Sequence, residues 1–124
     1  MEQRALILFA HGARDPRWAE PFQRLQQITQ AQSPQVRVAL AFLELMMPKL
    51  PELVRQLVQD GCTDMTVVPV FFGQGGHVLR DLPVMIEQLK KEFPGLQLKS
   101  AAAVGEDADV LNAIARYCVT TLAT

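Results

Sequence analysis

The hydrophobic positions along the chain alternate between two periods. Residues 5–10 form a short, continuous apolar run, which is typical of a strand buried on both faces. Over residues 17–32 the apolar side chains recur at helical spacing instead. The same change recurs three times, with predicted strands at 36–42, 65–72 and 96–99 and predicted helices at 50–58, 82–93 and 107–122. The pattern therefore predicts four successive strand–helix units.

This order of elements predicts an α/β fold with one parallel sheet, because right-handed crossovers place helices on both faces. The first and third strands are almost entirely apolar and belong in the centre of the sheet. The second and fourth strands contain Arg37 and Lys99, and charged residues suit the edges of the sheet. The expected strand order is 2-1-3-4, the doubly wound, flavodoxin-like arrangement. Pro69 conflicts with a central position of the third strand, because proline has no amide hydrogen to donate to a neighbouring strand. We therefore expect a bulge or an early strand end there.

The last predicted helix carries its apolar side chains on one face. These are Val110, Leu111, Ile114 and Cys118. An amphipathic helix normally lays such a face on a core, so we expect these four side chains to point inward.

Composition narrows the class of protein. A chain of 124 residues with 49% hydrophobic residues predicts one folded domain over residues 1–124. The formal charge of −1 argues against a dedicated nucleic-acid binder. Cys62 and Cys118 have neither metal-site nor redox spacing. No apolar run suits a signal peptide or a membrane span, so we expect a cytoplasmic protein without a membrane partner.

The only two histidines, His11 and His77, directly follow the first strand and the loop after the third. In open α/β sheets, ligands bind at the carboxyl ends of the strands, where the strand order reverses. Glu44 follows the second strand at the same edge, 33 residues from each histidine. Two imidazoles and one carboxylate suit a borderline divalent metal such as cobalt, nickel, zinc or iron(II). The sequence therefore predicts a metal site at this edge.

Glycines and arginines accompany these three residues. Gly12, Gly73, Gly75 and Gly76 lie beside the histidines, where glycine lets the backbone approach a large ligand closely. Arg14 and Arg80 are placed to pair with carboxylates of that ligand, whereas Arg17 suits a solvated helix start. Phe71, Phe72, Met46 and Met47 could form an apolar floor for a flat ligand, although core packing is the better explanation for most of them.

Each of these residues also has a structural explanation. The histidines could simply order their loops, Glu44 could favour a helix N-terminus, and the glycines could form a wide turn.

The sequence lacks the motifs that usually mark nucleotide binding and serine hydrolysis. The chain has no P-loop and no G-x-G-x-x-G after the first strand. Its only serines, Ser33 and Ser100, lie outside any G-x-S-x-G motif.

Three motifs in order resemble the class II tetrapyrrole chelatases, most closely the short CbiX type of sirohydrochlorin cobaltochelatase. They are His11-Gly12-Ala13-Arg14, Phe42-Leu43-Glu44 with Pro48, and Val68-Pro69-Val70-Phe71-Phe72 with Gly76-His77 and Asp81-Leu82-Pro83. Together they span nearly the whole chain, and the family carries proline at the position of Pro69. Ala13 departs from the usual serine, a mild change because that hydroxyl is not an expected ligand.

The resemblance implies insertion of Co2+, or Ni2+ in close relatives, into sirohydrochlorin without nucleotide hydrolysis or an organic cofactor, and it implies a homodimer. It matches His11 and His77 to the family's metal and catalytic positions and Glu44 to a carboxylate near them. Imidazole both ligates metal and accepts protons near neutral pH, so these histidines could hold the ion and take up pyrrole protons. A non-catalytic metal or tetrapyrrole carrier and a regulatory α/β module remain the alternatives.

Overall fold

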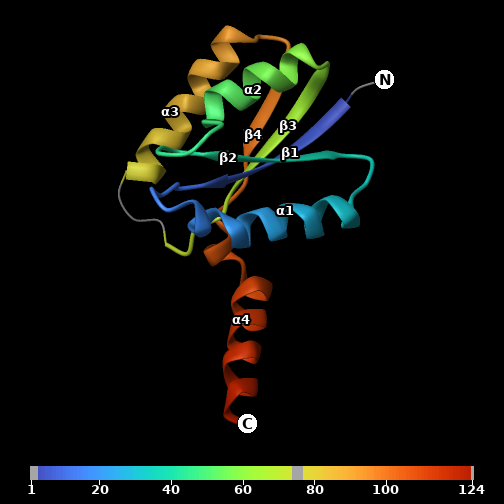
Figure 1. Cartoon of the computed structure of the whole chain (residues 1–124). Coiled ribbons are helices and arrows are strands. Elements are labelled where there is room, and N and C mark those ends of the chain that lie inside the picture. The colour runs from blue at the N-terminus through green and yellow to red at the C-terminus, as the bar shows by residue number, and fades with distance from the viewer. Residues whose placement is uncertain (1–2, 74–76, 124) are drawn as a thin grey trace.

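One sheet of four parallel strands forms the centre of the molecule (Figure 1). The computed structural model describes residues 3–73 and 77–123, with side chains over 3–73 and 80–123. The strands are β1 (Gln3–Ala10), β2 (Arg37–Phe42), β3 (Cys62–Pro69) and β4 (Gln97–Ser100). Their order is β2-β1-β3-β4 and every neighbouring pair is parallel, which confirms the predicted 2-1-3-4 arrangement.

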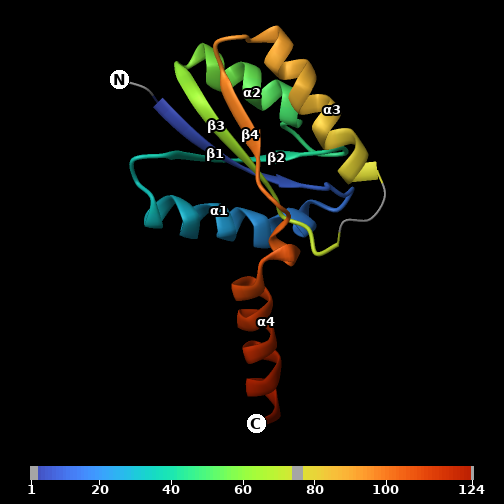
Figure 2. The same ribbon diagram turned by 180° about the vertical axis from the view of Figure 1, so that it is seen from behind.

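Helices cover both faces of this sheet. The α-helices are α1 (Glu20–Gln32), α2 (Leu50–Gln59), α3 (His77–Glu92) and α4 (Ala108–Thr120). A short 3-10 turn, η1 (Pro16–Ala19), leads into α1. Two more 3-10 turns, η2 (Val104–Glu106) and η3 (Thr121–Ala123), lie before and after α4. Helix α1 lies on one face, and α2 and α3 lie on the other (Figures 1 and 2). Within residues 3–73 and 77–123, no helix has the length and apolar character to cross a membrane.

The main core lies between the sheet and the pair α2–α3. Ile7 and Phe9 of β1 and Met65 and Val67 of β3 are fully buried there, because alternate strand residues point to the same face. Helix α2 contributes Leu50, Leu53, Val54 and Leu57, and α3 contributes Leu82, Ile86 and Leu89. A smaller cluster under α1 joins Ala10, Ala19 and Phe42 with Trp18 and Phe22. The helical periodicity in the sequence therefore marked these faces correctly.

Strand β3 ends at Pro69, three residues before the end that the hydrophobic pattern predicts. Proline has no amide hydrogen to give to the ladder, so an early end accommodates it. The next residue resumes the pairing, since the Val70 amide donates to the Phe9 carbonyl at 2.8 Å. The expectation of an early strand end is therefore confirmed, and the segment after Pro69 forms a loop beside β1.

Helix α4 contradicts the expectation that its apolar face points inward. It extends away from the sheet (Figures 1 and 2). Leu111, Ile114 and Cys118 are exposed and Val110 is only half-buried. Among the described elements, the extensive contacts of α4 are with η2 and η3, its neighbours in the chain. Hydrophobic periodicity shows that a helix has an apolar face but not which surface receives that face.

Exposed ion pairs connect elements at the periphery. Arg55 of α2 contacts both carboxylate oxygens of Glu92 in α3, at 2.9 and 3.0 Å, and this contact lowers the pKa of Glu92. Arg37 likewise lowers the pKa of Asp60. A carboxyl whose pKa is lower in the folded state stabilises the fold at neutral pH, and that contribution disappears as the pH falls through the folded-state pKa. Solvent exposure keeps the contribution small.

The core assignment predicts a sharp contrast between two helix positions. Leu57→Ala removes a fully buried side chain and should lower the free energy of unfolding by about 2–5 kcal/mol. The matched control Val84→Ala, at an exposed position of α3, should change it by less than about 0.5 kcal/mol. Urea unfolding followed by circular dichroism measures both values. Equal effects would show that α2 does not supply the core.

Candidate functional site

The candidate site forms where β1 and β2 end side by side. His11 directly follows β1, and Glu44 lies two residues beyond β2. The backbones stay paired after the strands stop, because the Leu43 amide donates to the Ala10 carbonyl at 2.9 Å and the Glu44 amide to the His11 carbonyl at 3.1 Å. Both side chains therefore leave from one fixed stretch of backbone at the carboxyl edge of the sheet.

Gly12 makes this close approach of the two loops possible. Its φ of +98° lies in the left-handed region, and a Cβ atom there would sit 1.8 Å from the carbonyl oxygen of Glu44. We predicted that Gly12 gives room to a ligand, but at this position a protein carbonyl fills the space. Leu45, the residue after Glu44, also adopts a positive φ of 67°, a strained conformation for a residue with a side chain.

His11 and Glu44 are in direct contact. The Nε2 atom of His11 lies 3.0 Å from Oε1 of Glu44, and the two side chains are 47% and 53% exposed. The imidazole also meets the Phe71 ring edge to face, with centroids 6.4 Å apart. Phe71 packs in the same way on the fully buried Phe9, at 5.9 Å. The core therefore supports the imidazole on one side, while solvent reaches the His11–Glu44 pair.

This pair has two chemical uses. With Nε2 protonated, the imidazole donates a hydrogen bond to the carboxylate, which leaves Nδ1 as the free nitrogen. Alternatively, a cation replaces the shared proton. An ion about 2.1 Å from each of two atoms that lie 3.0 Å apart makes an angle of about 90° with them, a geometry open to divalent metals. The pair thus offers two adjacent donors to a metal with little rearrangement.

The structure brings together only part of the predicted donor set. His77 is the first residue of α3, but its side chain, like Gly75 and Gly76, lies outside the described residues. The role of these three residues therefore stays a prediction. Among the side chains that the structure does describe, no group of three His, Cys, Asp or Glu residues could hold a metal ion.

The arginines that the sequence singles out differ in their surroundings. Arg14 is exposed and lines a shallow pocket of about 300 Å3 together with Leu45, Met46 and Met47. Arg80 is exposed in the first turns of α3. Arg17, in contrast, pairs with Asp15 at 2.7 Å and lowers the pKa of that carboxyl. The pairing fits the expectation that Arg17 serves the local helix start.

Sequence reasoning missed how the segment after β3 is held. Phe71 and Phe72 appeared only as parts of an apolar floor, yet Phe71 contacts His11 directly. The Gly105 amide of η2 donates to the Phe71 carbonyl at 2.9 Å, and a Cβ on Gly105 would sit 2.0 Å from the Phe72 carbonyl oxygen. Gly105 stands in no motif, so only the fold could reveal this contact.

The fold and site together define a class: a doubly wound α/β protein with a histidine–carboxylate pair at the carboxyl edge of its parallel sheet. Comparison with protein families identifies which member of the class it is. The CbiX family model matches residues 5–120. The chain belongs to the CbiX family.

Known proteins with similar sequences or structures agree with this assignment. The sirohydrochlorin cobaltochelatase of Methanopyrus kandleri is 30% identical over 82 residues, which are 66% of this chain and 57% of that protein. The Sulfolobus acidocaldarius protein of the same name is 29% identical over 107 residues, 86% and 83% of the two chains. The match thus spans little more than half of the first relative.

Two solved structures resemble the fold. A CbiX protein from Marinobacter aquaeolei has a TM-score of 0.84 and 34% identity, over 96% of this chain and 97% of its own. The sirohydrochlorin chelatase SirB of Bacillus subtilis, solved with cobalt, has a TM-score of 0.79 and 22% identity, over 92% of this chain and 49% of its own. At that identity, the similarity to SirB concerns the fold alone.

The contact between Gly12 and Glu44 predicts a position that tolerates no side chain. Gly12→Ala should lower the free energy of unfolding by more than about 1 kcal/mol, because both the positive φ and the neighbouring carbonyl oppose a Cβ. It should also separate Glu44 from His11. The control Gly95→Ala, whose Cβ meets nothing within 4 Å, should be neutral or slightly stabilising. Thermal unfolding compares them, and equal stability would contradict the close approach.

Proposed function

We propose that this chain inserts a divalent metal, Co2+ or its neighbour Ni2+, into sirohydrochlorin without nucleotide hydrolysis. The observation that carries the proposal is the solvent-accessible pair of His11 Nε2 and Glu44 Oε1, 3.0 Å apart at the carboxyl edge of the sheet. Membership of the CbiX family and the names of its relatives, which include cobaltochelatases and a ferrochelatase of Bacillus subtilis, support the same chemistry.

The side chains of the site must perform two tasks in this reaction. The metal must be held until it exchanges its bonds to the protein for bonds to four ring nitrogens, and two pyrrole N–H protons must be removed. His11 and His77 hold the ion and accept those protons, since neutral imidazole performs both tasks near physiological pH. Glu44 assists, either as a ligand or by orienting the His11 ring through their hydrogen bond. Acidification weakens metal binding, because protonated imidazole cannot ligate.

The surroundings of the pair suit a flat, carboxylate-rich ring. Leu45, Met47 and Phe72 are exposed apolar side chains on the loops after β2 and β3, and they offer a surface for the macrocycle. Arg14 and Arg80 are exposed and pair with carboxylates at its periphery. Gly75 and Gly76 let the backbone approach the ring closely.

The remaining parts of the proposal concern the setting of the reaction. The whole chain acts as one chelatase domain in the cytoplasm, as a homodimer and without an organic cofactor. Affinity alone would favour nickel over cobalt at imidazole and carboxylate ligands, so metal supply and site geometry select the physiological ion.

The proposal predicts how three substitutions affect turnover. His11→Ala and His77→Ala should each lower kcat/KM for Co2+ insertion by at least about 100-fold, because each removes a ligand and a proton acceptor. Glu44→Gln should lower it by about 10- to 100-fold. The visible spectrum of sirohydrochlorin incubated with Co2+ follows the reaction. The control Glu52→Gln, an exposed carboxylate on α2, should retain full activity.

The same assay separates the proposal from its alternative. A metal or tetrapyrrole carrier would bind Co2+ or the ring stoichiometrically, yet would not exceed the spontaneous rate of insertion. Full activity in the His11 and His77 variants would show that the reaction occurs elsewhere in the molecule.

The arginines predict a different kinetic effect. Arg14→Ala and Arg80→Ala should each raise the KM for sirohydrochlorin by about 10-fold, since each removes a charged hydrogen bond to the ring carboxylates. The KM for Co2+ and kcat should change little. Arg24→Ala, an exposed arginine on α1, serves as the control with unchanged constants. An unchanged KM for the ring in both variants would remove these arginines from the binding site.

A further inference from the structure

Leu45 combines a strained backbone with an exposed side chain. Its φ of 67° makes it, in the described part of the chain, the one residue other than glycine that lies in the left-handed region. Glycine and asparagine adopt this conformation readily, whereas the Cβ and branched side chain of leucine oppose it. Leucine at this position therefore costs the fold free energy that glycine or asparagine would not cost.

Core packing does not account for this cost. The near neighbours Leu43 and Met46 are half-buried, and each packs against one of the two core clusters. Leu45, in contrast, is 56% exposed. Strained residues persist where the surrounding structure holds them, and they cluster at sites that bind ligands. The conformation therefore indicates a use of the Leu45 side chain outside the core.

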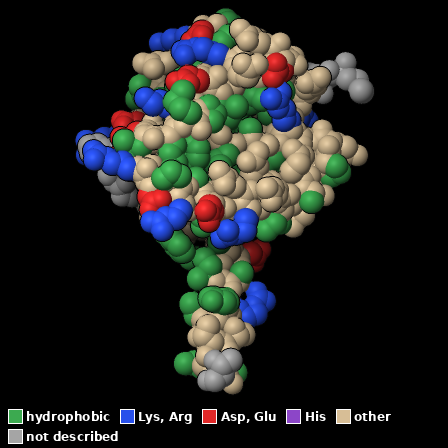
Figure 3. Space-filling view, in the orientation of Figure 1, with side chains coloured by type: hydrophobic (Ala, Val, Ile, Leu, Met, Phe, Trp, Pro, Cys, Tyr) green, Lys and Arg blue, Asp and Glu red, His purple; other side chains and the backbone are tan. Residues whose placement is uncertain are grey.

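Exposure alone would not mark a site. Apolar side chains reach the surface on the body of the molecule and along the projecting helix α4 alike (Figure 3), as is normal for folded proteins. Ile28 on α1 is as exposed as Leu45, at 56%, but it has the ordinary backbone of a helix. The strained backbone therefore distinguishes Leu45 from other exposed apolar residues.

The Leu45 side chain lines a pocket at the carboxyl edge of the sheet. This pocket of about 300 Å3 lies between α1 and the loops that follow β1 and β2, and Met46 and Met47 also line it. We call it the Leu45 pocket. Because Leu45 directly follows Glu44 in the chain, the pocket borders the pair of His11 and Glu44.

Arg14 gives the Leu45 pocket a positive charge. Its guanidinium forms no ion pair with any side chain of residues 3–73 and 80–123. Arg17, in contrast, is neutralised by Asp15. The side chain of Gln23 lines the same pocket and carries an amide group that donates hydrogen bonds. An unpaired cation and an amide beside apolar side chains suit a planar apolar group that carries a carboxylate.

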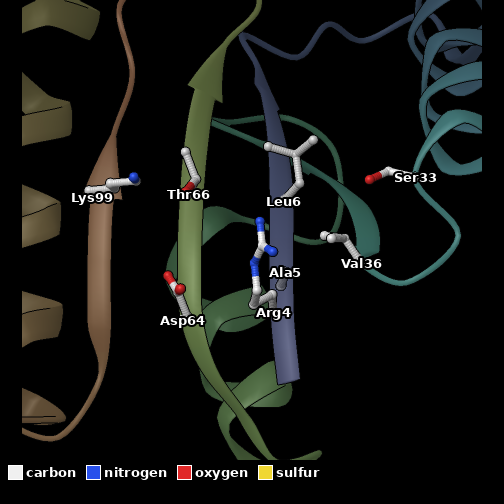
Figure 4. Close-up of a pocket in the computed structure, with 8 residues that line it drawn as sticks. All are labelled: Arg4, Ala5, Leu6, Ser33, Val36, Asp64, Thr66 and Lys99. Atoms are coloured by element: carbon white, nitrogen blue, oxygen red, sulfur yellow. The ribbon is translucent and has the colours of Figure 1, made fainter. Parts of the chain in front are cut away.

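A second hollow with charged walls is less suited to such a ligand of the site. It has about 340 Å3, and its lining includes Arg4, Asp64 and Lys99 (Figure 4). Arg4 lies in the first half of β1, whereas His11 follows the last residue of that strand. At about 3.3 Å per residue, the two positions are roughly 20 Å apart along the strand. The Leu45 pocket, in contrast, lies beside the donor pair.

We propose that the Leu45 pocket receives one carboxylate-bearing pyrrole ring of the tetrapyrrole, and that Leu45 is held in its strained conformation to pack on the face of that ring. Arg14 and Gln23 bind the carboxylate of the ring's side arm. This inference rests on the proposed function and deepens it. A volume of about 300 Å3 is at the lower end of the range for ligand pockets, so one ring enters and the centre of the macrocycle stays at the His11–Glu44 pair.

Ring binding in the absence of metal tests the role of Leu45. Leu45→Asn removes the apolar side chain but suits the backbone, since asparagine readily adopts a positive φ. The dissociation constant of metal-free sirohydrochlorin, from titrations followed by its visible spectrum, should rise by about 10-fold, while the midpoint of thermal unfolding should not fall. Leu45→Met should recover most of the lost affinity. The control Ile28→Asn, matched in exposure, should bind the ring as the unchanged chain does.

Turnover separates a contact with the ring from a role in positioning Glu44. During Co2+ insertion, the effect of Leu45→Asn should appear in the KM for sirohydrochlorin and not in kcat. Equal ring affinity in Leu45→Asn and Ile28→Asn, or a lower kcat at an unchanged KM, would overturn the inference. A chain that binds the ring without inserting metal would refute the proposed function alone. A chain without affinity for the ring would overturn both.

Discussion

The pairing of two backbones beyond the ends of their strands is the constraint on which the rest of the site depends. The Glu44 amide reaches the His11 carbonyl only because Gly12 has no side chain to block the Glu44 carbonyl. Parallel strands bring their carboxyl ends to one edge, but they do not by themselves bring side chains from adjacent loops into contact. Here the extended ladder does so, and the imidazole and carboxylate meet at 3.0 Å.

Much of this arrangement could be predicted from the sequence because it follows from short-range patterns. The apolar runs and helical stripes predict the sheet, its order and the faces of α2 and α3, since burial dictates their spacing. The position of His11 and Glu44 after neighbouring strands predicts that they share an edge. Pro69 could be anticipated as a strand end because its missing amide has the same effect in any sheet.

Other features depend on contacts between distant segments, which periodicity does not encode. The stripe of α4 is visible in the sequence, but its direction is set by η2, whose Gly105 fits under the Phe72 carbonyl. The support of His11 by Phe71 depends equally on the loop after β3 turning back beside β1. The sequence indicates that position 12 needs a glycine, but the group that approaches Gly12 is the Glu44 carbonyl of the protein itself and not a ligand.

The hydrogen bond from Gly105 to Phe71 joins two regions that the chain order separates. On one side of it lies the Phe71 ring against the His11 imidazole, and on the other lies the first turn of α4. A displacement of the helix base is therefore transmitted through one short turn to the ring that supports the imidazole. The placement of α4 and the support of the proposed catalytic histidine therefore depend on the same hydrogen bond.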